Sequence, residues 1–379
     1  MATDELSSTA AAAAPAASAS GASTHELPAR STSNNLNIQQ QQSPSSQTPA
    51  EDGPFDIVQT YRTLLTSDPD ITMPVAALES LIELLRATPS STAMETVEVV
   101  KKEKARLLAS APNPLPLLAG ADIFEQYLLR SLRGQTEGTS TAVLSFEDTR
   151  NHLLRNSQLF VDRAKAARDE IAVWGSKYVL DGKVVMTTGC SRAVLKILLR
   201  AAGDRGKHFA VIYVLDGSPG EKAAVQELRE AGVDVETIRP YKIAYMLSQQ
   251  HDINLILLGA EALTQNGGTI SRMGAFQLAH LAKSIKAPPK RVYVAAETHK
   301  IVRKTPIWHP IVQSVGIRQK GVKLEDLGVD VAEEERLMQN LLAEEDEVDY
   351  TTPDLIDGII TEQGVKMTSQ IWEMVEDYS

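Results

Sequence analysis

The sequence predicts an α/β fold in which an all-helical part precedes a mostly parallel β-sheet. After Gly182, short β-branched runs alternate with helical stretches, whereas before about residue 180 the apolar residues recur at helical spacing. Alternation of strand and helix is typical of a Rossmann-like sheet with helices on both faces. The first fifty residues are rich in Ala, Ser, Thr, Gln and Pro and contain no aromatic residue. We therefore expect a disordered low-complexity tail over 1–52, a helical domain over 53–180 and a Rossmann-like domain over 181–379.

The helical domain is predicted from apolar residues that would share one face of a helix. Two such stripes are Ile57, Val58, Tyr61, Leu64 and Leu65, and then Leu78, Leu81, Ile82 and Leu85. Thr72 followed by Pro74 predicts a helix start, and Pro89 and the stretch APNPLP separate later helices. We expect about five helices, with these stripes as their core. The arginines of the last long helix, Arg150, Arg155, Arg163 and Arg168, are expected on a solvated face, although such arginines can also bind a phosphate on a partner.

The strands of the second domain are predicted from five apolar runs, KVVMTT, HFAVIYVL, VDVETI, NLILLGA and RVYVAA. Ligands bind at the carboxyl ends of the strands in sheets of this kind, so the function is expected there. A polar, Glu-rich segment at about 305–350 is expected to be an acidic insertion. The residues around Ile356, Ile359 and Ile360 predict a final strand or helix that packs on the sheet.

Composition excludes several classes of protein. The 38 Lys and Arg residues against 49 Asp and Glu give a formal charge of −11, which opposes direct binding of nucleic acid. No apolar run approaches the roughly 20 residues of a membrane-spanning helix, and no signal-peptide pattern is present, so a cytoplasmic protein without a membrane partner is expected. The one cysteine, Cys190, allows no internal disulfide, which fits a reducing compartment.

Candidate binding residues follow four of the predicted strands. The first strand runs into a turn of small and hydroxyl residues, which leaves backbone N–H groups free to meet an anion, although many such turns bind nothing. The fourth strand ends in GAEALTQNGGTISR, which brings a carboxylate, an amide and a cation to one crevice. The candidate ligand-binding residues are Thr188, Gly189, Cys190, Ser191, Arg192, Ser218, Glu261, Asn266, Gly267, Gly268, Arg272 and Lys300.

Metal and cofactor sites find little support in the sequence. The seven histidines lie far apart, without the spacing of a zinc-binding helix, and His299 alone is more often structural than catalytic. Neither a Walker loop nor a G-x-G-x-x-G turn is present. We therefore expect no metal and no cofactor, and a sugar phosphate or nucleoside monophosphate as the ligand of the crevice.

Four stretches carry a resemblance to a known family: TTGCSR, LLGAEALTQNGGTISRMGAFQLA, VYVAAETHK and DYTTPDLIDGIITEQG. They resemble the regulatory subunits of translation initiation factor 2B, the guanine nucleotide exchange factor for initiation factor 2. The resemblance runs from about Phe55 to the end and does not cover the tail or the acidic insertion. Among the alpha, beta and delta types, the short helical part and the phrase GAEALTQNGG are most similar to alpha.

The same fold is shared with sugar-phosphate aldose–ketose isomerases, which act on ribose 1,5-bisphosphate or methylthioribose 1-phosphate. Those enzymes pair a cysteine with an aspartate, and the resemblance puts their cysteine at Gly189 and their aspartate at Glu261. Cys190 is one position late. A glycine carries no proton, so we expect no isomerase turnover and no catalytic residue, while the crevice is retained as a binding pocket.

The resemblance implies a regulatory role and a set of partners. The chain would form a homodimer that bridges assemblies of the beta, gamma, delta and epsilon subunits. With beta and delta it would sense initiation factor 2 whose alpha subunit is phosphorylated. Two alternatives stay open: an isomerase of the ribose 1,5-bisphosphate type that uses Glu261, and a free-standing sensor of a sugar phosphate or nucleotide.

Overall fold

The computed structural model describes residues 55–68, 70–88, 92–133, 162–204, 206–218, 220–303, 317 and 348–376. All of them belong to one compact unit, Pro54–Ser379. The tail predicted over 1–52 and most of the insertion predicted at about 305–350 lie outside the described residues.

The N-terminal part is helical, as predicted. Its helices are α1 (Ile57–Ser67), α2 (Met73–Ala87), α3 (Ala93–Ser110), α4 (Leu115–Arg133) and a helix over 162–175. Asp56 begins α1 by accepting a hydrogen bond from the N–H of Val58 at 3.1 Å. Thr72 precedes α2 and Pro74 lies in its first turn, which confirms the predicted helix start. The two predicted stripes contribute Ile57, Tyr61, Leu78, Leu81, Ile82 and Leu85 to one buried cluster.

The central sheet has seven strands in the order β10-β9-β7-β4-β1-β2-β3. They are β1 (Val184–Thr188), β2 (Ala210–Val214), β3 (Asp234–Ile238), β4 (Ile253–Gly259), β7 (Arg291–Ala295), β9 (Gly358–Thr361) and β10 (Gly364–Lys366). All pairs are parallel except β9 with β10. The five predicted strands are confirmed, and the last apolar stretch of the chain forms β9.

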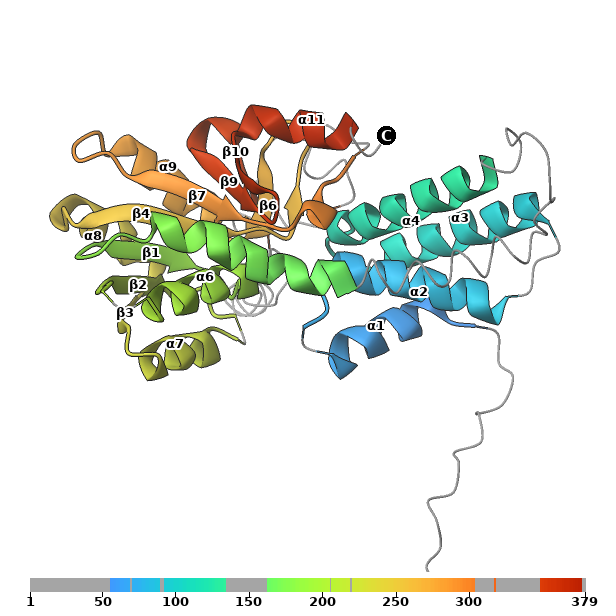
Figure 1. Ribbon diagram of the computed structural model, residues 1–379, viewed down its shortest axis with the longest axis horizontal. Coiled ribbons are helices and arrows are strands. Elements are labelled where there is room, and N and C mark those ends of the chain that lie inside the picture. Colours follow the sequence, from blue (N-terminus) through green and yellow to red (C-terminus); the bar gives the residue numbers. More distant parts are fainter. Residues whose placement is uncertain are drawn as a thin grey trace, which may run out of the picture. The chain divides into compact units, whose positions relative to one another are not determined.

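Helices cover both faces of this sheet (Figure 1). They are α6 (Arg192–Ala202) and α7 (Glu221–Glu230) on one face, and α8 (Ile243–Gln249), α9 (Ala275–Ser284) and α11 (Ile371–Glu376) on the other. Successive side chains of a strand point to opposite faces, so Val185 packs with α6 while the adjacent Met186 packs with α8 and α9. The two cores fix the strand register and hence the position of every strand end.

A second sheet, which the sequence did not predict, has the order β5-β6-β8 and is antiparallel. Its strands are β5 (Ala262–Leu263), β6 (Thr269–Arg272) and β8 (Val348–Thr351). The described residues also include five short 3₁₀ helices: η1 (Ser176–Tyr178), η2 (Pro240–Lys242), η3 (Thr298–Lys300), η6 (Pro353–Leu355) and η7 (Thr368–Gln370). The start of α4 packs on the small sheet, with Leu115 and Ala119 against Ile270 and Tyr350.

The helix over 162–175 links the two parts of the chain. Ala164 belongs to the core of the helical part and Ile171 to the core between the large sheet and α6. Arg168, which was expected on a solvated face, is buried at 2% exposure. That expectation was wrong because the spacing of charges within one helix cannot reveal acidic partners supplied by distant segments. None of the described helices is both long enough and apolar enough to cross a membrane.

Candidate functional site

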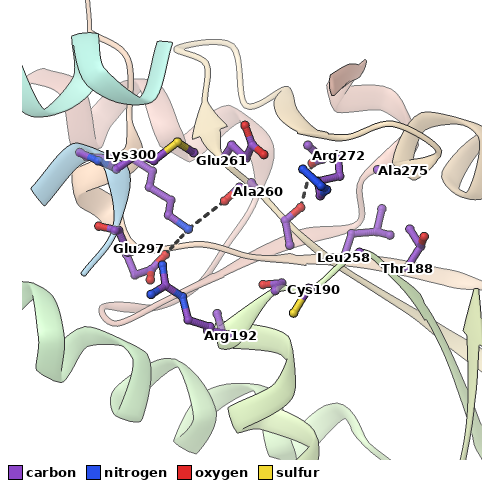
Figure 2. A pocket seen from close by; sticks show the side chains of 18 of the residues that line it. Thr188, Cys190, Arg192, Leu258, Ala260, Glu261, Arg272, Ala275, Glu297 and Lys300 are labelled. Atoms are coloured by element: carbon purple, nitrogen blue, oxygen red, sulfur yellow. Dashed lines mark hydrogen bonds and ion pairs between the residues drawn. The ribbon is translucent and has the colours of Figure 1, made fainter. Parts of the chain in front are cut away.

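A crevice of about 210 Å³ lies at the carboxyl ends of β1, β4 and β7. We call it the basic crevice, since its walls carry three cationic side chains, Arg192, Arg272 and Lys300. Residues 71–74, at the start of α2, close its other side. Figure 2 shows the side chains that surround it. The helical part and the sheet therefore both contribute to the site.

The turn from β1 into α6 forms one wall. Gly189 has φ = +74°, a left-handed conformation that side-chain-bearing residues rarely adopt, and its carbonyl accepts a 2.5 Å hydrogen bond from the Tyr213 hydroxyl. Ser191 is the N-cap of α6, where its Oγ accepts from the N–H of Val194 at 3.4 Å. A Cβ at Gly259 would lie 2.3 Å from Cβ of Ser191, so β4 can pass this turn only as glycine.

Two of the three cations are anchored by the protein itself. Arg192 donates from Nη1 to the carbonyl of Ile71 at 3.0 Å, which ties α6 to the start of α2. Lys300 donates to the carbonyl of Ala260 at 2.8 Å and forms a 2.7 Å ion pair with Glu297, as Figure 2 shows. Arg272 is held more loosely, because its Nε lies 3.8 Å from Oδ2 of Asp216. Anchoring of this kind presets the cations for an anion at low cost in side-chain entropy.

A buried charge cluster lies beneath the crevice. Glu297 is 1% exposed and pairs with Lys300 and, at 3.6 Å, with Nε of Arg168. Burial alone would raise the pKa of Glu297, but the charge and hydrogen bond of Lys300 outweigh it and hold the pKa at about 2. Arg168 also binds the side chain and carbonyl of Asp70, next to α2. The cluster therefore joins the helical part to the end of β7.

His299 is a structural residue of the same junction. Its Nε2 lies 3.1 Å from Oγ1 of Thr72, and the ring is buried. Burial lowers the pKa of His299 to about 4, so the imidazole is neutral at pH 7. Thr72 consequently does not cap α2 with its side chain, and the N-terminus of this helix, at the wall of the crevice, keeps its backbone N–H groups for other acceptors.

Glu261 lines the crevice, and a residue of the helical part donates a hydrogen bond to its carboxylate. Its Oε2 accepts a 2.8 Å hydrogen bond from Nδ2 of Asn113, the residue that precedes α4 by two positions and whose Oδ1 accepts from the N–H of Leu115. Glu261 thus fastens the turn after β4 to the beginning of α4. The sequence marked Glu261 as a binding residue but gave no sign of this partner.

The structure brings together eight of the twelve predicted binding residues. The eight that line the crevice are Thr188, Gly189, Cys190, Ser191, Arg192, Glu261, Arg272 and Lys300. The other four lie elsewhere. Asn266, Gly267 and Gly268 form the turn between β5 and β6, where Asn266 bonds the hydroxyl of Tyr350 at 3.0 Å. Ser218 is buried in the turn between β2 and α7.

The glycines of the β5–β6 turn have a structural reason. Gly267 has φ = +82°, and a Cβ there would lie 2.3 Å from the carbonyl of Thr368. A Cβ at Gly268 would lie 2.3 Å from the Tyr350 hydroxyl. Asn-Gly is a common hairpin signal, and this turn explains the motif without any ligand.

Two parts of the site were absent from the predicted set. Residues 71–74 come from the helical part, whose apolar stripes were expected to be core. Glu297 neutralises Lys300 from the same strand end. Asp216, at the end of β2, was also absent; it lies beside the crevice rather than in its lining, with Oδ2 3.6 Å from the position that a Cβ of residue 189 would take. The only sequence signal for Asp216 and Glu297 was their place directly after an apolar run.

The chemistry available here is anion binding. Burial and the nearby carboxylate of Asp216 raise the pKa of the Cys190 thiol, so the reactive thiolate is disfavoured. Among the described residues, no group of three or more His, Cys, Asp or Glu side chains could hold a metal ion. The crevice combines cationic side chains, the N–H groups of the β1–α6 turn and the start of α2. All three favour a ligand group with negative charge.

The chain is similar to two kinds of known protein. Translation initiation factor eIF2B subunit alpha of Dictyostelium discoideum is 24% identical over 323 residues, which are 84% of this chain and 95% of that protein. Ribose 1,5-bisphosphate isomerase of Archaeoglobus fulgidus is 31% identical over 222 residues, which are 58% of this chain and 65% of the enzyme.

A solved structure shows the same fold. The tetrameric eIF2B-beta2-delta2 complex from C. thermophilum contains a chain that superposes with a TM-score of 0.64 at 19% identity, over 85% of this chain and 94% of that chain. The model of the initiation factor 2 subunit family matches residues 66–368, which are most of the sequence. The chain is therefore a member of the initiation factor 2 subunit family.

Proposed function

We propose that the chain is a regulatory, non-catalytic subunit, of the alpha type, of the cytoplasmic guanine nucleotide exchange factor for initiation factor 2. It acts as a homodimer that bridges assemblies of the beta, gamma, delta and epsilon subunits. Similarity to an alpha subunit over 84% of the chain supports the subunit type. One argument supports the absence of turnover: the resemblance puts the cysteine of the related isomerases at Gly189, which has no side chain and adopts φ = +74°.

The basic crevice then serves as a binding pocket for a sugar phosphate or a nucleoside monophosphate. Arg192 and Lys300, both anchored, would meet the phosphate, and the loosely held Arg272 completes the positive wall. A ligand that binds only the folded chain stabilises it by mass action. Because residues 71–74 and the strand ends line the same crevice, an occupied crevice would also hold the helical part to the sheet.

The test is to recover the tagged full-length chain gently from its own cells and to measure the native mass and the subunits present. We expect a large complex with stoichiometric partners of the exchange factor. The recovered complex should bind initiation factor 2 with a phosphorylated alpha subunit more tightly than the same factor after phosphatase treatment. Recovery as a free dimer alone would contradict the proposal.

A second candidate, a sugar-phosphate isomerase, is favoured by the 31% identity to ribose 1,5-bisphosphate isomerase and by the carboxylate of Glu261 in the crevice. Conversion of ribose 1,5-bisphosphate should be measured for the wild type and for Glu261→Gln, with Asn113→Ala as a control that removes one hydrogen bond to Glu261 but keeps its carboxylate. We expect no product from any of the three. Turnover that only Glu261→Gln abolishes would establish the enzyme instead.

A further inference from the structure

A second cavity, of about 550 Å³, adjoins the basic crevice and shares Thr188 with it. Its walls come from the ends of β1 and β2, from η2 and α8, from the start of α9 and from β8. The lining residues are Thr188, Val214, Asp216, Pro240, Ile243, Met273, Gly274, Phe276, Gln277, Asp349 and Tyr350. Two of them are aspartates and none is Lys, Arg or His, so we call it the acidic cavity. Its volume lies in the range of ligand-binding cavities.

Both aspartates keep one oxygen without a hydrogen-bond donor. Asp349 uses Oδ2 to accept from the N–H groups of Gly274 and Phe276, at 2.8 and 3.0 Å, while its buried Oδ1 has no hydrogen-bond partner in the described part of the chain. Asp216 uses Oδ1 to accept from the N–H of Ser218 at 2.9 Å, and its buried Oδ2 likewise has no hydrogen bond there.

Neither oxygen has a cation within hydrogen-bond distance among the described residues. The Asp216 side chain is 9% exposed, and its one ion-pair contact among the described residues, Nε of Arg272, lies 3.8 Å from Oδ2, beyond hydrogen-bond distance. Asp349 has no ion-pair contact within the described ranges. A buried polar atom without a partner is unfavourable, so two such atoms on one cavity indicate donors supplied from outside the described residues.

Exposed apolar side chains at the lining or next to it in sequence indicate what kind of molecule supplies them. Met273, which lines the cavity, is 44% exposed, and Tyr241, between the lining residues Pro240 and Ile243 in sequence, is 79% exposed. Exposed apolar patches mark protein interfaces or ligand-binding grooves, and Tyr and Met are enriched in protein interfaces. Tyrosine rings also bind a guanidinium on their faces.

We infer that the acidic cavity receives an arginine side chain of a partner protein, with the aliphatic stem against Ile243 and Met273 and the guanidinium toward Asp216 and Asp349. Arginine fits better than lysine because its planar fork carries five donors and can serve two separated carboxylates, whereas the ammonium is a point charge. The inference is independent of the regulatory function, because it rests only on this cavity.

The test uses the full-length chain labelled in its Ile and Met methyl groups and observed by NMR. The probe is the peptide acetyl-Gly-Arg-Gly-amide, and the control is the same peptide with citrulline, the neutral isostere of arginine. We expect the arginine peptide to shift the Ile243 and Met273 signals saturably and the citrulline peptide to bind at least about tenfold more weakly. Equal binding of both peptides, or shifts confined to other methyl groups, would overturn the inference.

Variants locate the effect. Asp349→Asn should weaken binding of the arginine peptide about tenfold, whereas Asp357→Asn should not, although Asp357 also accepts a backbone N–H, that of Val292, at 2.7 Å. Asp349 also accepts hydrogen bonds from the start of α9, so its substitution could disturb the fold. The second variant is therefore Gln277→Lys, which brings a cation to the cavity wall and should weaken binding of the arginine peptide at least as much. Normal binding by Gln277→Lys would count against the site.

Free agmatine, which has the guanidinium without the peptide, separates the two sources of this chemistry. A partner's arginine would also contact the exposed ring of Tyr241, which would increase its affinity. The peptide should therefore bind more tightly than agmatine, and Tyr241→Ala should remove that advantage. If agmatine binds as tightly as the peptide, the cavity is a site for a small amine and the inference of a protein partner is wrong.

Discussion

The basic crevice and the acidic cavity lie at the same edge of one sheet, yet they differ in whether their charged groups are bonded to other groups of the chain. In the crevice, Arg192 and Lys300 are already bonded to a carbonyl or a carboxylate of the chain. In the cavity, Asp216 and Asp349 each leave one buried oxygen without a hydrogen bond. Arg192 and Lys300 therefore also stabilise the fold, whereas one oxygen each of Asp216 and Asp349 has no hydrogen-bond donor among the described residues.

The sharpest test of that contrast is Glu297→Gln, which keeps the shape of the side chain and removes its charge. Arg168 and Lys300 would then share a buried site without their common counter-charge, so unfolding should become easier by about 3–5 kcal/mol. The measurement is the free energy of unfolding in urea.

A matched control is Asp252→Asn, which breaks an exposed pair with Lys183 at 3.0 Å and should change the same quantity by less than about 1 kcal/mol. Similar losses in the two variants would mean that the buried cluster does not hold the helical part to the sheet.

The sequence predicted the parts of the molecule whose signal is local. Four of the five β-branched runs became strands because each is mostly apolar and lies between two helical layers, whereas the run that forms β3 is a largely exposed edge strand. The small sheet was missed because β5 has two residues and β6 pairs with β8 across a long stretch of chain. Arg168 was misplaced because its partners, Asp70 and Glu297, come from opposite sides of the helix in sequence.

In the candidate site, too, the sequence predicted what depends on local signals and missed what depends on contacts between distant residues. Residues at the end of a strand or a few positions after it, such as Thr188 and Lys300, lie in the crevice because parallel strands end at one edge. Asn266, Gly267 and Gly268 follow β5 rather than a strand of the large sheet, and an antiparallel turn explains them. The partner of Glu261, Asn113, could not be predicted, since nothing near either residue indicates the contact.

The second prediction concerns acid stability and the buried ring of His299. Its pKa in the folded chain is about 4 against an ordinary 6.5, so the folded state excludes a proton that the unfolded state binds. Stability from this group is complete above pH 6.5 and is lost as the pH falls toward 4, by about 2 kcal/mol between pH 7 and pH 5.

His299→Gln keeps a hydrogen-bonding group near Thr72 but cannot take up the proton. Unfolding free energies of both proteins at pH 7 and pH 5 give the test: the loss on acidification should be smaller in the variant by that amount. Asp349 titrates in the opposite sense, because burial raises its pKa to about 7, but it does so equally in both proteins and cancels in the comparison. An identical loss in the two proteins would show that His299 is not excluded from protonation.

The third prediction addresses the wall between the two cavities. Gly189→Ala adds a Cβ that has room, at 3.6 Å from Oδ2 of Asp216 and 3.8 Å from Cβ of Arg272, but φ = +74° is unfavourable for alanine. We expect a loss of about 1 kcal/mol in unfolding free energy, from backbone strain alone. The comparison is Gly182→Ala, with φ = +66° and no atom near its Cβ, which should lose a similar amount. A much larger loss at Gly189 would mean that the wall is packed more tightly than these distances indicate.

The smallest expected effect separates the two cavities by the sign of the ion they take. Inorganic phosphate should raise the melting temperature by about 2 °C at threefold its dissociation constant, which corresponds to about 0.8 kcal/mol, when ionic strength is matched with chloride. Arg272→Gln should reduce this rise, because Arg272 is the crevice cation held least firmly, with Asp216 3.8 Å away. Asp349→Asn should leave it unchanged, because Asp349 lines only the acidic cavity. A rise that both variants reduce equally would mean that the two cavities respond as one site, and the difference between their charged groups would then have no consequence for binding.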